Sequence, residues 1–280
     1  MPRRYERHFH SSPLTDAIRD MHRMESLSLL DTGIHRLHPA TKLITTIAFL
    51  IAALSFDRHA VGRLLPLFLY PLLIAAMADL PWKPFLKRLL AVEPLIVGIG
   101  VLNPIFDSVP IFIGDIPVAR GWLTFLSIVL KTSLAVLAAL QLIACTGMER
   151  MLSGLHLLGM PRVFVMQISL TYRYITVLAE ETGRLLIAYS LRSSGKRGVR
   201  AAAWGSLAGM LLLRSFDRAQ RVHQAMRLRG YSGYAPLPPG TRPGLRDAVF
   251  LACWLSWFVL VRLEDLPLLF GRWMTGFFGS

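Results

Sequence analysis

WLTFLSIVLKTSLAVLAALQLIAC, residues 122–145, is a nearly uncharged stretch in which Lys131 is the one charged residue. A helix needs about 20 consecutive apolar residues to cross the hydrocarbon core of a bilayer. This stretch is long enough, so it predicts a membrane-spanning helix and makes the chain an integral membrane protein.

Four further apolar runs predict further spans. Leu89–Phe106 also reaches the usual lower limit of about 17 residues. Three shorter runs need flanking basic side chains that snorkel to the interface: Leu43–Phe56, Leu64–Ala78 and Val249–Val261. A sixth run, Ala201–Leu213, has charged flanks and is either a span or a re-entrant or surface-lying helix. The fold class predicted is therefore an all-α integral membrane protein with five or six transmembrane helices.

The composition supports a membrane protein with one basic side. Of the 280 residues, 54% are hydrophobic and 17% charged, whereas soluble domains carry about 25% charged residues. The net charge is +14, and the basic residues alternate with long apolar stretches. This pattern argues against a soluble enzyme, a disordered tail and a nucleic-acid-binding protein. Cys145 and Cys253 both lie in apolar runs, so they form neither a disulfide framework nor a zinc cluster.

Basic residues gather in three regions, which the positive-inside rule places in the cytoplasm. These are the N-terminal region, the loop with Lys83, Lys87 and Arg88, and residues 149–246, which hold 15 Arg and Lys against four acids. Within the first region, apolar spacing from Leu14 to Met24 predicts a short amphipathic helix. The predicted organisation is an N-terminal amphipathic cytoplasmic segment, transmembrane helices 1–4, a cytoplasmic helical domain, and a C-terminal transmembrane helix with its tail: 1–41, 42–147, 148–246 and 247–280.

Two amphipathic helices are expected in the long cytoplasmic region. The first runs from Pro161 to Ser193 or Ser194, and its polar residues recur at helical spacing: Arg173, Glu180 and Arg184. Glu180 and Arg184 have the favourable i to i+4 order. The second is LLLRSFDRAQRVHQAMRLRG (211–230), which has two stripes that we expect on opposite faces: an apolar one of Leu212, Phe216, Ala219, Val222 and Met226, and a basic one of Arg214, Arg218 and Arg221.

Both helices end in the same pattern, an apolar residue, an arginine and a small residue. The first ends Leu191-Arg192-Ser193 and the second Leu228-Arg229-Gly230. An arginine there can offer a planar five-donor fork to a carboxylate or to carbonyls, and the small residue lets a partner backbone approach. Two such ends could engage two copies of a partner. The alternative is that both helices simply lie on the membrane surface.

These residues resemble the CbiQ branch of the transmembrane (T) components of energy-coupling-factor transporters. The features that match, in the family's order and at its spacing, are HRLHPATKL (35–43), NPIF (103–106), LHLLGMPRVFVMQISLTYRYITVLAEE (155–181), YSLRSSG (189–195) and AMRLRGYSG (225–233). The family commonly has Asp where this chain has His38, and Ala where it has Leu191 and Leu228.

The resemblance implies a non-catalytic subunit whose two coupling helices dock into grooves on two copies of a cytoplasmic ABC-type ATPase. Arg192 and Arg229 would insert into the grooves, with Leu191, Ser193, Leu228 and Gly230 beside them. ATP and Mg would belong to the ATPase. Movement would pass to a substrate-binding membrane (S) subunit that holds the substrate, Co2+ first and Ni2+ second, with a vitamin as an alternative. A small accessory membrane subunit is a further partner, and the location would be the bacterial cytoplasmic (inner) membrane, with several spans and a cytoplasmic N-terminus.

Other candidate sites are weaker. The chain has no G-x-x-x-x-G-K-[ST] loop, so nucleotide hydrolysis must belong to another chain. His8, His10, His35 and His38 are expected to be solvent-facing or interfacial rather than metal ligands. Glu93 and Lys131 lie within apolar runs, where we favour a structural role such as pairing with each other. A membrane-embedded lipid or prenyl transferase would need clustered acids to hold Mg2+, and the sequence has no such cluster.

Overall fold

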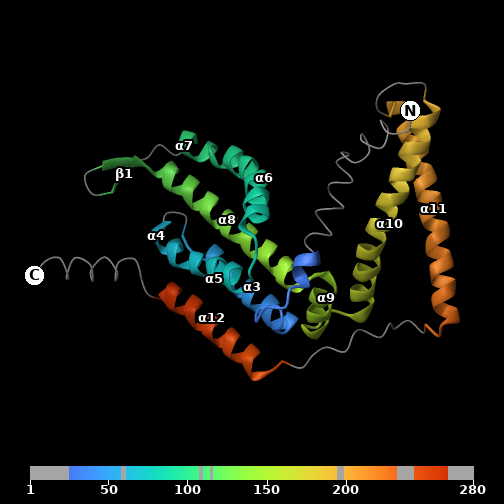
Figure 1. Ribbon diagram of the computed structural model, residues 1–280. Coiled ribbons are helices and arrows are strands. Elements are labelled where there is room, and N and C mark those ends of the chain that lie inside the picture. Colours follow the sequence, from blue (N-terminus) through green and yellow to red (C-terminus); the bar gives the residue numbers. More distant parts are fainter. Residues whose placement is uncertain are drawn as a thin grey trace, which may run out of the picture. The chain divides into compact units, whose positions relative to one another are not determined.

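The computed structural model describes residues 25–57, 61–106, 110–113, 116–193, 199–231 and 243–263. This part of the chain is predominantly helical (Figure 1). Its elements are α3 (Pro39–Leu54), α4 (Val61–Leu64), the 3-10 turn η1 (Leu65–Phe68), α5 (Leu69–Met77), α6 (Trp82–Gly100), α7 (Leu102–Phe106), β1 (Pro110–Ile113), β2 (Ile116–Ala119), α8 (Arg120–Thr146), α9 (Met148–Leu157), α10 (Arg162–Arg192), α11 (Ala201–Leu228) and α12 (Leu245–Leu263). The predicted amphipathic segment Leu14–Met24 lies outside the described residues, as do His8 and His10.

Each of the five apolar runs corresponds to a helical segment. Among the described helices, α8 is the one that is both long and apolar enough to cross a membrane by these two criteria. The helical segments Pro39–Leu54 and Val61–Met77 are apolar but shorter. The second of these tightens into the 3-10 turn at Pro66, which lacks the amide hydrogen that a regular helix uses. Helices α6 and α12 have 19 residues each.

The described residues agree with the predicted all-α class, and one short antiparallel hairpin, formed by β1 and β2, is added to the helices. Pro110 pairs with Ala119 and Ile113 with Ile116. The two segments are short, rich in Ile, Phe and Val, and separated in sequence by the turn-forming dipeptide Gly-Asp. Two such segments around a turn are typical of a hairpin. They lie beside the long apolar runs, and the hairpin was therefore not predicted.

The sixth apolar run does not form a helix of its own. Residues 201–213 are the first half of α11, which continues without a break to Leu228. The run contains no proline. At its two glycines, Gly205 and Gly209, the space that a Cβ atom would occupy has no neighbouring atom within 4 Å. Nothing local therefore stops the helix before the basic residues begin.

The chain divides into two compact units, and residues 24–154 with 241–280 form the larger one. Its core is an aromatic cluster between α3, α5 and α12. The Phe49 ring, 0% exposed, stacks on Tyr70 at 4.6 Å and lies 5.7 Å from Phe258, measured between ring centroids. Trp254 meets Tyr70 edge-on at 4.8 Å. Helix α3 is therefore held between α5 and α12, and α8 contributes the fully buried Leu134 to the same core.

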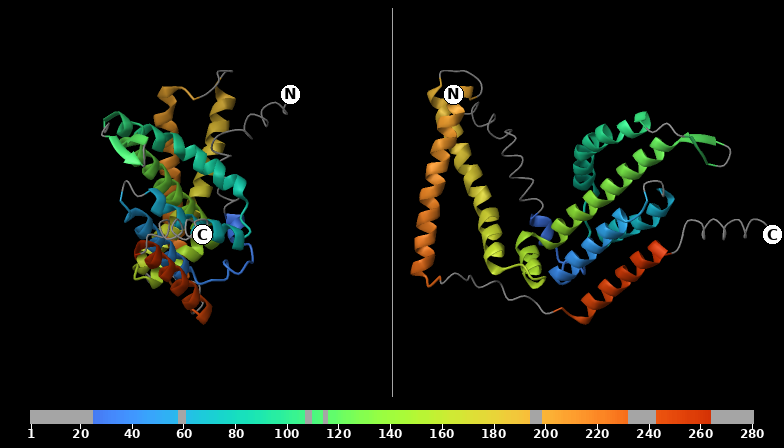
Figure 2. Two further views of the ribbon diagram at one scale, coloured as in Figure 1. Left: turned by 90° about the vertical axis from the view of Figure 1, so that its left-hand side faces the viewer. Right: turned by 180° about the vertical axis from the view of Figure 1, so that it is seen from behind.

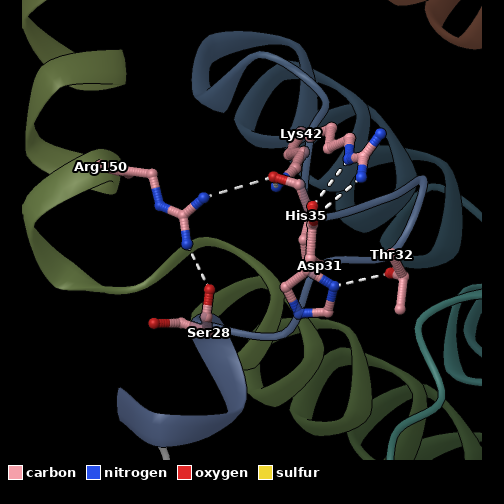
Figure 3. Close-up of polar contacts among 7 residues, drawn as sticks. Ser28, Asp31, Thr32, His35, Lys42 and Arg150 are labelled. Carbon is pink, nitrogen blue, oxygen red and sulfur yellow. Dashed lines mark hydrogen bonds and ion pairs between the residues drawn. The ribbon is translucent and has the colours of Figure 1, made fainter.

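A buried polar cluster joins α3 to the helices that follow in sequence (Figure 3). The Lys42 ammonium, on a side chain that is almost fully buried, donates to the carbonyls of His35 at 3.2 Å and Cys145 at 2.9 Å. The Arg150 guanidinium of α9 donates to the carbonyl of Ser28 and, at 3.4 Å, to that of His35. Two cationic side chains thus satisfy carbonyls of the segment before α3, at Ser28 and His35, and of the last turn of α8, at Cys145.

His35 and His38 are buried rather than solvent-facing, with 2% and 4% of their surface exposed. His35 Nδ1 lies 2.7 Å from Thr32 Oγ1. His38 is the N-cap of α3, and its Nδ1 accepts a hydrogen bond from the amide of Ala40 at 3.2 Å. Here a histidine performs the capping that an Asp or Ser usually provides, which explains why it lies at the helix start.

Acid should weaken this cluster. Burial lowers the pKa of His35 from its ordinary value of 6.5, and the nearby Lys42 ammonium lowers it further. The unfolded chain therefore binds a proton at a higher pH than the folded chain does. The free energy of unfolding should accordingly fall as the pH drops below about 6.5. Thermal unfolding in detergent across this range should show the loss, and His35→Gln should flatten it; an unchanged slope in the variant would contradict this account.

Glu93 and Lys131 have partners other than each other. The Ser133 hydroxyl of α8 lies 2.7 Å from Glu93 Oε1 of α6. The Lys131 ammonium donates to the carbonyl of Phe56 at 2.5 Å. Both contacts join α8 to neighbouring segments, which agrees with the structural role expected for these two residues but replaces the direct pair by two separate links.

Candidate functional site

Helices α10 and α11 form an antiparallel pair, and Figure 2 shows them side by side. Three contacts along the pair establish the direction. At one end the Arg200 amide donates to the Tyr189 hydroxyl at 3.4 Å, and near the middle Arg214 pairs with Glu181. At the other end the Tyr231 hydroxyl donates to Met166 Sδ at 3.1 Å. Later residues of α11 therefore contact earlier residues of α10.

A groove of ≈ 520 Å³ lies between the two helices toward the end that holds Tyr231. Its walls are mainly apolar and include Leu170, Tyr174 and Leu178 of α10 and, from the predicted apolar stripe of α11, Ala219, Val222 and Met226. This contact explains why the amphipathic pattern of each helix is strong: each one buries part of its apolar stripe against the other.

Ion pairs fix the middle of the pair. Glu180 and Arg184 approach to 3.8 Å, as their spacing predicts. Glu181, with 16% of its side chain exposed, also lies 3.7 Å from Arg184 and pairs with Arg214 across the two helices. The pair between helices was missed because spacing along one helix says nothing about a residue 33 positions away.

The predicted stripes of α11 are not on opposite faces. Arg214 and Arg218, assigned to a face away from the apolar stripe, lie against α10. Leu212 and Phe216, assigned to the packed stripe, are 68% and 62% exposed. Arg214 pairs with Glu181 of α10 on this side of α11. Leu213 and Trp204 add to the exposed apolar surface of the first half of α11.

Both helices end where the sequence predicts. Helix α10 ends at Arg192 and is capped by Ser193. Helix α11 ends at Leu228 and is capped by Arg229; Gly230 follows with φ of +83°. The Tyr231 amide returns to the carbonyl of Met226 at 3.0 Å, which completes a left-handed helix stop that requires glycine.

The two helix-end arginines project into solvent. Leu191 is 72% and Leu228 90% exposed, and both arginines beside them are exposed. Neither guanidinium has a hydrogen bond or an ion pair within the part of the chain that the structure describes. Because α10 and α11 are antiparallel, their C-terminal ends lie at opposite ends of the pair, separated by about 40 Å, the length of α11. The site therefore consists of two separated cationic tips.

Within the described ranges, no three His, Cys, Asp or Glu side chains come together in a group that could hold a metal ion.

Comparison with known proteins gives the family. The model of the cobalt transport protein family CbiQ matches residues 31–239 of this chain. The chain belongs to the CbiQ family. That range includes α3–α11 and both cationic tips. CbiQ proteins are transmembrane components of transporters rather than enzymes, so the family resemblance seen in the sequence is confirmed.

Relatives of this CbiQ-family chain carry names from the same class of transporter. It is 29% identical to the energy-coupling factor transporter transmembrane protein EcfT of Bacillus subtilis (strain 168), over 71% of this chain and 81% of the relative. It is 29% identical to EcfT of Brevibacillus brevis over 86% of this chain and 94% of the relative. The nickel permease LarQ of Lactiplantibacillus plantarum is 29% identical over 47% of this chain and 48% of the permease.

Proposed function

We propose that this chain is the membrane coupling subunit of an energy-coupling-factor importer. Arg192 and Arg229, with Leu191, Ser193, Leu228 and Gly230 beside them, dock into two copies of a cytoplasmic ATPase. Movement driven by ATP in those subunits passes through the α10–α11 pair to a substrate-binding membrane subunit. A small accessory membrane subunit is a further partner, and the chain itself binds no nucleotide.

The observation that carries this proposal is the position of the two arginines. Each is exposed, each ends a long helix, and the two helices are antiparallel. A single chain with two separated guanidinium tips can contact two copies of one partner, and a guanidinium fork suits carboxylates and carbonyls within a groove. A helix pair that only lay on lipid would not need leucine, arginine and a small residue at both of these ends.

Five spans fit the helical segments best, namely α3, residues 61–77, α6, α8 and α12. We do not propose a sixth span at 201–213, because these residues are the start of α11, the helix that Arg229 caps. The exposed apolar residues of α11 supply a surface for the S subunit or for lipid. We place the N-terminus and residues 148–246 in the bacterial cytoplasm, with 42–147 and the helix of 247–280 in the inner membrane.

The proposed substrate is Co2+, held by the S subunit. The family description supports this choice, and the similarity to a nickel permease supports Ni2+ as the second candidate. A vitamin is the third. Uptake assays of the complete transporter with each labelled substrate would decide between these three. If nickel alone were taken up, nickel would replace cobalt in this proposal.

The number of ATPase copies bound to one coupling subunit should equal the number of its cationic tips. The complex purified from native membranes should contain two ATPase copies per coupling subunit, measured by native mass spectrometry. Arg192→Glu or Arg229→Glu alone should lower this to one copy, because each variant removes one docking end. Two copies in both variants would rule out the arginines as docking residues.

A further inference from the structure

The segment 155–240, which carries the α10–α11 pair, is attached to the larger unit by two chain connections. The chain leaves the larger unit after Gly154 of α9 and rejoins it at residue 241, just before α12. Along the chain, a displacement of the helix pair reaches the larger unit at the ends of α9 and α12. The contacts of those two ends decide which spanning helix receives the displacement.

The outgoing connection is fastened to the first turn of α3. A Cβ built on Gly154 would lie 3.0 Å from the amide nitrogen of Ala40 and 3.1 Å from the carbonyl carbon of Pro39. Two backbones thus touch where a side chain would separate them. One turn earlier, Arg150 donates to the carbonyls of Ser28 and His35, in the segment that leads into α3. Helix α9 is held to the start of α3 on two sides.

The returning connection is fastened at the same place by Asp247, in the first turn of α12. One carboxylate oxygen, Oδ1, accepts a hydrogen bond from the amide of His38 at 2.6 Å. The other, Oδ2, accepts one from the amide of Gly244 at 2.8 Å, which caps α12 itself. The carboxylate therefore ties the start of α12 to the N-cap of α3, and these two residues are 209 positions apart in sequence.

We propose that residues 38–42 form the mechanical junction of this subunit, with Arg150, Gly154 and Asp247 as its positioning residues. This inference rests on the proposed coupling function. The outgoing and returning connections converge on one helix turn, so movement of the α10–α11 pair is delivered to α3. From there it reaches α5, α8 and α12, which all pack on α3. A loose attachment would let the chain connections absorb the same movement.

The test measures substrate imported per ATP hydrolysed by the complete transporter in proteoliposomes. Asp247→Asn removes one of two carboxylate acceptors, and Gly154→Ala and Gly154→Val insert side chains of rising size between α9 and α3. Each should lower uptake per ATP by about fivefold or more, the scale of a typical coupling free energy. Copurified ATPase should stay at the wild-type amount for Asp247→Asn and Gly154→Ala, and both variants should still unfold above the assay temperature in detergent.

Matched controls change the same residue types outside the junction. Asp79→Asn alters an exposed aspartate, and Gly98→Ala and Gly98→Val alter a helical glycine that meets nothing within 4 Å. These variants should keep wild-type uptake per ATP. Normal uptake per ATP in Asp247→Asn and Gly154→Ala would overturn the inference, as would a loss that merely follows ATPase release or unfolding. Absence of uptake by the wild-type complex would instead overturn the proposed function.

Discussion

Reversing the charge of both helix tips, Arg192→Glu with Arg229→Glu, should abolish ATP-driven uptake by the assembled transporter. Each guanidinium is exposed and makes no hydrogen bond or ion pair among the described residues, so its loss should not disturb folding. In a docked complex each charge-assisted hydrogen bond contributes about 1.5–3 kcal/mol, and reversal also leaves the partner's acceptors facing a carboxylate. Uptake into proteoliposomes and coelution of the ATPase should be lost together.

The matched control reverses two other exposed arginines on the same helices, Arg173→Glu with Arg221→Glu. The change in net charge is identical, but neither residue lies at a helix end. This control should retain most of the uptake and of the ATPase association. If both double variants lose uptake equally, general electrostatic attraction rather than docking of the two tips explains the loss. Full uptake by Arg192→Glu with Arg229→Glu would contradict the proposed function outright.

The largest loss of stability should come from Phe49→Ala. The Phe49 ring is fully buried in the aromatic cluster between α3, α5 and α12, 4.6 Å from the ring of Tyr70. Removing it leaves a cavity lined by rigid rings, and replacing a buried Phe by Ala costs about 3–5 kcal/mol. Since helices in a bilayer associate largely through close packing, the lost contacts have no hydrophobic substitute.

Unfolding measured in mixed detergent micelles would check this expectation. Ile51→Ala is the natural control, because Ile51 lies on the same helix but is 64% exposed. Its truncation should change the free energy of unfolding by less than about 1 kcal/mol. Equal effects of the two substitutions would mean that the aromatic cluster does not hold α3 in place.

Features that depend on neighbours in sequence could be predicted well. The apolar run 122–145 lies within α8, and the end of α11 follows from Gly230. Such features are set by helix length, capping and the left-handed turn at glycine, which are local properties.

Features that depend on contacts between residues distant in sequence could not be predicted. The side of α11 that faces α10 includes Arg214, which pairs with Glu181, and no periodicity reveals this pair. His35 is buried, and its carbonyl accepts hydrogen bonds from both Arg150 of α9 and Lys42 of α3. No role was predicted for Asp247, which is simply the first residue of the predicted segment 247–280. Its contact with the His38 amide has no sequence signal.

The antiparallel arrangement of α10 and α11 also has a consequence for symmetry. Two antiparallel helices are related by an approximate twofold axis that passes across their middle, here close to Glu181 and Arg214. That rotation exchanges Leu191-Arg192-Ser193 with Leu228-Arg229-Gly230. One polypeptide without any internal duplication can thus present a nearly symmetric platform to a twofold dimer. Within the two triplets, Ser193 against Gly230 is the difference by which two otherwise identical subunits could be told apart.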